Sequence, residues 1–135
     1  MTGYTMSMTL DRPFDDVVPQ VKEALAEQGF GVLTEIDVRA TLQAKLGVDV
    51  PDQVILGACR PELAHRALEA APSVAALLPC NVVVRTVDHE TIVELVDPAV
   101  MSRLEDGAEI DAIATEARSR LSAALQALAT STEEV

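Results

Sequence analysis

The sequence predicts one layered domain of mixed α and β structure, in which helices cover one face of a sheet that contains at least one antiparallel hairpin. Short β-branched or alternating segments are interleaved with segments whose apolar residues recur every three or four positions. Two β-branched runs flank the short polar segment Asp88-His89-Glu90, which indicates a β-hairpin. The 135 residues suit a single domain over residues 1–130, with a frayed tail over residues 131–135.

The expected elements follow the order β-α-β-α-β-α-β-β-α. Alternation or apolar content predicts strands over residues 4–10, 30–36, 53–58, 81–87 and 91–97. Helices are expected from Pro13 to Gly29, from Asp37 to Gly47 and from Pro61 to about Ala71, with a turn or two over residues 73–78. A loose helical segment from Pro98 breaks at Gly107, and a last helix follows.

Several side chains have predicted places within these elements. Pro19 is expected in or near the first turn of its helix, because a proline deeper inside costs about 3 kcal/mol. Leu42 and Leu46 are expected to point inward from the short helix that Asp37 caps. The core is expected to bury Val54, Leu56, Val82, Val84, Leu121 and Leu125.

Composition argues against several partners. The chain carries 22 acidic and 10 basic residues, for a formal net charge of −12, and aromatic residues are only 2%. The excess of acidic residues repels phosphate backbones, and the few aromatic residues leave little to stack on bases. We therefore expect no nucleic acid partner. The basic residues are too few and scattered for a membrane-binding patch.

The sequence favours a cytoplasmic location. Met1 leads into a polar, alternating segment without the charged and apolar regions of a signal peptide, and no apolar stretch approaches the roughly 20 residues of a membrane helix. The two cysteines are therefore expected to be reduced thiols.

Three segments closely resemble an uncharacterised family, catalogued as domain of unknown function 302. They are GFGVLTEIDV (residues 29–38), ILGACRPELAHRALEA (residues 55–70) and LLPCNVVVR (residues 77–85). The resemblance implies an α+β fold: a layered sandwich with a curved, largely antiparallel sheet and helices on one face, similar to the TATA-binding-protein class. It also implies a homodimer. It implies no reaction and no cofactor.

Cys59 is the most suggestive residue for function. It ends an apolar strand and precedes the helix that Pro61 begins, with Arg60 beside it. Unpaired N–H groups at a helix start would lower the pKa of its thiol, whereas burial would raise it. We expect the helix start to prevail, which would make Cys59 a reactive or ligand-holding thiol. Otherwise it is a small buried strand residue.

The chain leaves the predicted sheet after Cys59, passes through a helical segment and returns to the sheet at Cys80. The two cysteines could therefore meet at the same end of the sheet. A transient disulfide or a shared soft metal, Cu(I) or Zn²⁺, is conceivable, although no C-x-x-C pair or dense ligand cluster predicts a metal site. His65 lies six residues after Cys59, about 9 Å along a helix, which disfavours joint ligation. His89 is expected to be solvated in the hairpin turn.

Three further polar residues belong to the segments that resemble the family. Glu35 and Asp37 share strand parity, so they could act as paired carboxylates, or else Asp37 is a helix cap and Glu35 an edge charge. Asn81, beside Cys80, could hydrogen-bond a turn or a ligand. Motifs for phosphate loops, dinucleotide binding, zinc proteases and serine hydrolases are absent from the sequence.

Three functions remain open from the sequence. The first is a small homodimeric binding module with a thiol-lined pocket for a small anionic or thiophilic ligand or a soft metal. The second is a thiol-dependent enzyme with Cys59 as its nucleophile. The third is a structural oligomerisation or interaction domain in which these residues only pack.

Overall fold

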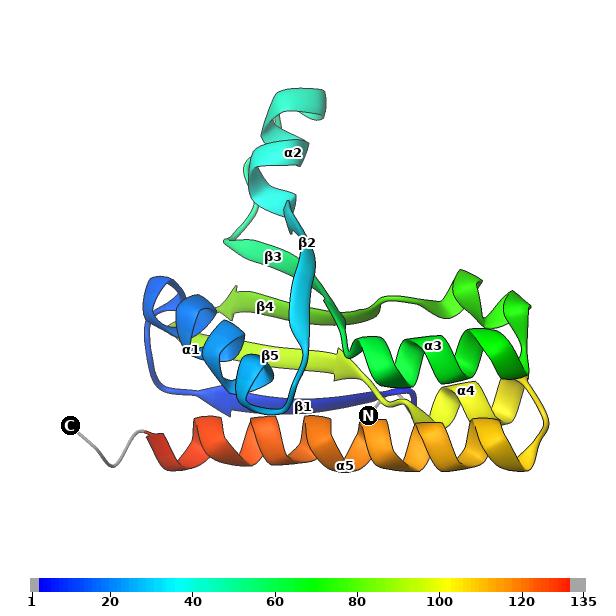
Figure 1. The fold of residues 1–135 in the computed structure, drawn as a ribbon. Coiled ribbons are helices and arrows are strands. Elements are labelled where there is room, and N and C mark those ends of the chain that lie inside the picture. Colours follow the sequence, from blue (N-terminus) through cyan, green and yellow to red (C-terminus); the bar gives the residue numbers. More distant parts are fainter. Residues whose placement is uncertain (1–2, 132–135) are drawn as a thin grey trace.

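The computed structural model describes residues 3–131, and its elements follow the predicted order (Figure 1). The strands are β1 (Thr5–Leu10), β2 (Gly31–Asp37), β3 (Gln53–Cys59), β4 (Cys80–Val87) and β5 (Glu90–Val96). The helices are α1 (Phe14–Glu27), α2 (Val38–Leu46), α3 (Pro61–Ala70), α4 (Ala99–Leu104) and α5 (Ala108–Ser131), with a 3₁₀ helix η1 (Pro72–Leu77). Apart from Ser131, the tail expected to fray lies outside the described residues.

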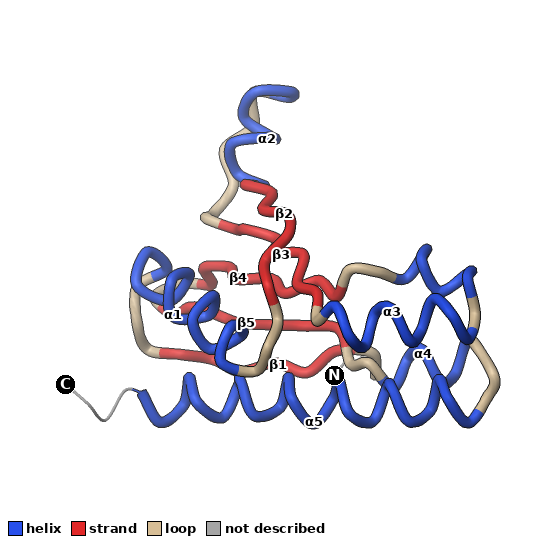
Figure 2. Tube along the Cα trace, viewed as in Figure 1, coloured by secondary structure: helices blue, strands red, loops and turns tan. Residues whose placement is uncertain are grey.

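The five strands form one open sheet in the order β1-β5-β4-β3-β2, and every neighbouring pair is antiparallel (Figure 2). The fold is therefore α+β. The predicted hairpin joins β4 to β5 with Val87 opposite Glu90, and Asp88 adopts a φ of 55° in its two-residue turn. Figure 1 shows that the sheet twists strongly, so that β2 runs across the direction of β1 and β5.

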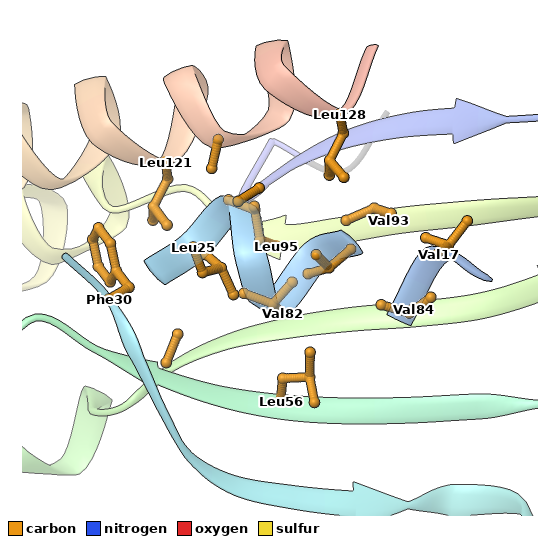
Figure 3. Close-up of a cluster of buried hydrophobic side chains, with 14 of the residues drawn as sticks. Val17, Leu25, Phe30, Leu56, Val82, Val84, Val93, Leu95, Leu121 and Leu128 are labelled. Carbon is orange, nitrogen blue, oxygen red and sulfur yellow. The ribbon is translucent and has the colours of Figure 1, made fainter. Parts of the chain in front are cut away.

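One face of the sheet carries the main hydrophobic core beneath α1 and α5 (Figure 3). Strand alternation sends every second side chain to this face, and the stripes of the two helices meet them. Five of the six residues predicted to be buried are buried, whereas Leu125 is only half-buried at the edge of the cluster. A second apolar cluster joins α3, η1, α4 and the first half of α5 beside the end of the sheet.

The end of α1 shows how local chemistry positions β2. Gly29 adopts a φ of 82°, its N–H donates to the Ala26 carbonyl, and the Phe30 N–H donates to the Leu25 carbonyl. This is a Schellman motif, which also brings Phe30 and Leu25 into the core together. The predicted strand start at Phe30 is therefore one residue early.

One prediction for the helices holds only loosely, and one is wrong. Pro19 is near the first turn of α1 and not in it, since it is the sixth residue of the helix, at an exposed position in the second turn. Leu42 and Leu46 do not pack inward, because α2 stands away from the sheet and contains no buried residue. Among residues 3–131, no helix is long and apolar enough to cross a membrane.

Candidate functional site

A small apolar pocket lies where β3 ends, β4 begins and α3 starts. Its cavity volume is about 30 Å³, and it is partly open to solvent. Cys59 and Cys80 both line it, together with Arg60, while the remaining lining residues are apolar. These are Phe30, Ala58, Leu63, Ala64, Ala67, Leu78, Met101, Ile113 and Ala117. The structure thus brings the two cysteines to one site at the same end of the sheet.

The register of the sheet explains how each cysteine reaches the pocket. Cys80 lies opposite Ala58, so strand alternation turns its side chain toward the helix-covered face with Ala58. Cys59 follows Ala58 at the end of β3, where the chain leaves the sheet for α3. Cys80 therefore lies deeper in the pocket and Cys59 closer to its rim. Both thiols are free.

Burial is the main cause of the pKa shifts of both thiols. It raises the pKa of the Cys59 thiol, and it raises the pKa of Cys80 to about 11, to which the nearby Cys59 adds a smaller repulsion between thiolates. The lowered pKa expected for Cys59 is therefore wrong in direction. The helix start does not prevail, because the burial of the Cys59 thiol disfavours the thiolate more strongly.

Arg60 has a larger part in this site than the sequence suggested. Its side chain is only 17% exposed, and its Nη1 donates to the Gln28 carbonyl at 3.0 Å, beyond the end of α1. Nη2 lies 3.9 Å from Glu62, and the buried Nε has no hydrogen-bond partner among residues 3–131. The guanidinium lies so close to Gly29 that a Cβ there would overlap Nη1. A positive charge is therefore fixed at the border of an apolar pocket.

Glu35 and Asp37 lie at the other end of β2 from the thiols. The register pairs Asp37 with Val54, whereas Gly31 pairs with Cys59. Asp37 caps α2 by accepting the Ala40 N–H at 2.9 Å, and Glu35 forms an ion pair with Lys22 at 2.6 Å. Both carboxylates line a separate hollow of about 260 Å³ beside α1. The structure thus gives each a local partner and does not join them to the cysteines.

The other candidate residues lie outside the pocket lining. Asn81 is exposed opposite Gly57 in the neighbouring strand. The His65 side chain is 74% exposed and lies 3.9 Å from Glu69 on its own helix. His89 is exposed in the hairpin turn. Over residues 3–131, no group of three or more His, Cys, Asp or Glu side chains is arranged to hold a metal ion.

Sequence reasoning missed most of the pocket wall. Met101 comes from the short helix α4, and Ile113 and Ala117 come from α5, far along the chain from both cysteines. Their periodicity predicts burial, and it gives no sign that they face a pocket. The one local signal for Arg60 is Gly29, whose left-handed backbone leaves room for the guanidinium.

Comparisons with known proteins place the chain in a family. A crystal structure of an uncharacterised conserved DUF302 protein from Bacillus stearothermophilus superposes with a TM-score of 0.84 and 28% sequence identity, over 91% of this chain and 96% of that one. A comparison with curated proteins finds no match. The family described as domain of unknown function DUF302 matches residues 6–128. The chain therefore belongs to the DUF302 family.

Proposed function

We propose that this protein is a small homodimeric binding module whose ligand site is the pocket at Cys59 and Cys80. The observation that carries the proposal is the meeting of two thiols, from separate segments of the chain, at one apolar pocket. Sulfur donors in apolar surroundings suit a small thiophilic ligand or a soft metal such as Cu(I). The homodimer itself rests on the family resemblance, and the cytoplasmic location on the sequence.

The volume of the pocket limits the size of the ligand that can enter it. Its cavity of about 30 Å³ is near the volume that one water molecule occupies, whereas pockets for organic ligands span about 300–1,000 Å³. The ligand, or the part of it that enters, is therefore an ion or a group of few atoms. Arg60 supplies a positive charge that would offset the charge of a thiolate complex or of an anionic ligand.

The pocket favours binding over catalysis by Cys59. A cysteine nucleophile reacts as the thiolate, and an enzyme lowers its pKa with a nearby base or positive charge. Here Arg60 supplies a positive charge, but neither histidine lines the pocket to act as the base, whereas a thiophilic ligand can displace the thiol protons without one. The thiol-dependent enzyme is therefore the weaker candidate.

An interaction domain is a second candidate, favoured by one separate observation. Helix α2 projects from the body with no buried residue, and its Leu46 side chain is 69% exposed. Exposed apolar surface of this kind is typical of protein interfaces. This candidate is compatible with a ligand pocket elsewhere in the chain.

Native mass spectrometry with two small probes tests the pocket. Arsenous acid condenses with two thiols to release two water molecules, and Cu⁺ displaces two thiol protons without electron transfer. We expect the reduced protein to bind one arsenic or one Cu(I) per chain in the presence of a competing chelator. Cys59→Ser and Cys80→Ser should each abolish this binding.

Asn81→Ala is the matched control, because Asn81 lies beside Cys80 but outside the pocket lining. It should bind both probes like the unmodified chain. Failure of both probes to bind, or binding that survives both serine substitutions, would remove the thiol pocket as the ligand site. The interaction domain would then be the strongest remaining candidate.

A further inference from the structure

The part of the chain from Leu33 to Val50, which we term the arm, projects away from the body of the protein (Figure 1). It contains the end of β2, helix α2 and the loop that returns to β3. Its exposed apolar side chains are Leu33 at 66%, Ile36 at 49%, Leu46 at 69% and Val48 at 42%. The arm therefore concentrates apolar surface that its own chain leaves open to water.

Helix α2 needs more contacts than its own chain provides. It has nine residues, and isolated helices shorter than about 12–15 residues are marginal in water. Val38, Leu42 and Leu46 recur at every fourth position and form a stripe along it, of which Val38 and Leu42 are only half-buried and Leu46 is exposed. A helix of this length gains stability mainly by packing its apolar stripe. We therefore expect the surface of another molecule to pack on the stripe of α2.

The apolar surface continues from the arm onto the sheet. Ile36 lies opposite Ile55, and Ile55 lies opposite Val83, so the three form one row across β2, β3 and β4. Strand alternation places this row on the face opposite the core residues Leu56 and Val82. Because α1 and α5 pack on the core face, this row lies on the face that those helices leave uncovered, and Ile36 joins it to the arm.

The charges of helix α2, which Glu35, Asp37 and Asp49 flank within the arm, fit a second copy of the chain. Helix α2 carries Arg39 and Lys45 and no acidic residue, on a chain of net charge −12. Arg39 is paired with Asp49 at 3.1 Å and Asp52 at 3.3 Å. Within the described part of the chain, no carboxylate lies within ion-pair distance of Lys45. A copy of the same acidic protein would supply one.

We propose that a second copy covers the arm, with the two α2 helices antiparallel about a two-fold axis. This arrangement rests on the homodimer of the proposed function and gives it an interface. It places Lys45 of each copy beside the helix start of the other, where Asp37 lies, and it opposes the two helix dipoles. Leu42 then lies near the axis against its symmetry mate, and Leu46 packs beside Val38 of the partner subunit.

The test compares two leucines of nearly equal exposure. Leu46→Glu places a charge on the arm, and Leu104→Glu places the same charge on α4, where the leucine is 65% exposed. Both variants carry the same net charge and change an exposed residue, so circular dichroism should report an unchanged fold. Light scattering and sedimentation velocity at micromolar concentration then give the oligomeric state.

We expect the unmodified chain and Leu104→Glu to be dimers, and Leu46→Glu to dissociate with a Kd at least about tenfold higher, because the new carboxylate replaces an apolar contact and lies near Asp37 of the partner subunit. A dimer that persists in Leu46→Glu would overturn the role of the arm while leaving the homodimer in place. Dissociation of both variants would show sensitivity to charge alone and would likewise exclude the arm. A monomeric unmodified chain would overturn the homodimer and this interface together.

Discussion

Gly29→Ala should destabilise the protein because two constraints meet at that position. The backbone φ of 82° belongs to the left-handed region, where a side chain costs about 1 kcal/mol or slightly more. A Cβ there would also overlap Nη1 of Arg60, so the guanidinium must move. Because the overlap is with the far end of a long side chain, the guanidinium can be displaced, and what is lost is its hydrogen bond to the Gln28 carbonyl.

The two costs add to a measurable loss. A hydrogen bond from a charged donor contributes about 1.5–3 kcal/mol, so the free energy of unfolding should fall by about 3 kcal/mol in total. Gly47→Ala is the matched control, since Gly47 also ends a helix with a positive φ of 68° but has open space around its Cα. That substitution should cost about 1 kcal/mol.

Urea denaturation of both variants measures these costs, and a second background isolates the contact. In Arg60→Ala, Gly29→Ala has no guanidinium to displace, so its cost should fall to that of Gly47→Ala. Equal costs for Gly29→Ala and Gly47→Ala in the unmodified background would refute the reasoning. So would a Gly29→Ala cost that is unchanged by removing Arg60.

Three further predictions concern the thiols, the helix cap and the charge. Stability should decline as the pH rises from about 8.5, the ordinary thiol pKa, to about 11, because the folded state holds the Cys80 proton more tightly than the unfolded state does. Cys80→Ala should flatten this decline in denaturation experiments, and an unchanged slope would exclude Cys80 as its cause. Asp37→Ala should weaken α2 by about 1 kcal/mol and raise amide hydrogen exchange there, while exchange in β4 stays the same. Fluorescence anisotropy with labelled DNA or RNA at physiological salt should detect no binding, given 22 acidic against 10 basic residues, and micromolar affinity that weakens with added salt would reveal an overlooked basic patch.

Features that depend on neighbouring residues could be predicted from the sequence. Pro61 begins α3 as expected, because an N–H group at the first helical position would have no acceptor within the helix. Asp37 caps α2 and Gly47 ends it, since both roles are set by the residue and its immediate neighbours. The same holds for the hairpin between β4 and β5.

The pKa of Cys59 could not be predicted, because two opposing local effects had to be weighed against a distant environment. The helix start and Arg60 were visible in the sequence and favoured the thiolate. The burial that reverses the balance involves Phe30, Met101 and Ala117, which come from other parts of the chain. Only the folded structure shows which effect is larger.

The wrong prediction for α2 has a different cause, and it bears on how such stripes are interpreted. The spacing of Leu42 and Leu46 correctly indicates a helix with an apolar side. Such periodicity indicates that the apolar side is buried against some surface. It does not report whether the cover belongs to the same chain. In α1 and α5 the stripe is buried against the sheet, whereas in α2 it is at most half-buried and ends at the exposed Leu46. The same pattern that predicts a core in one helix is therefore the pattern that predicts an interface in another.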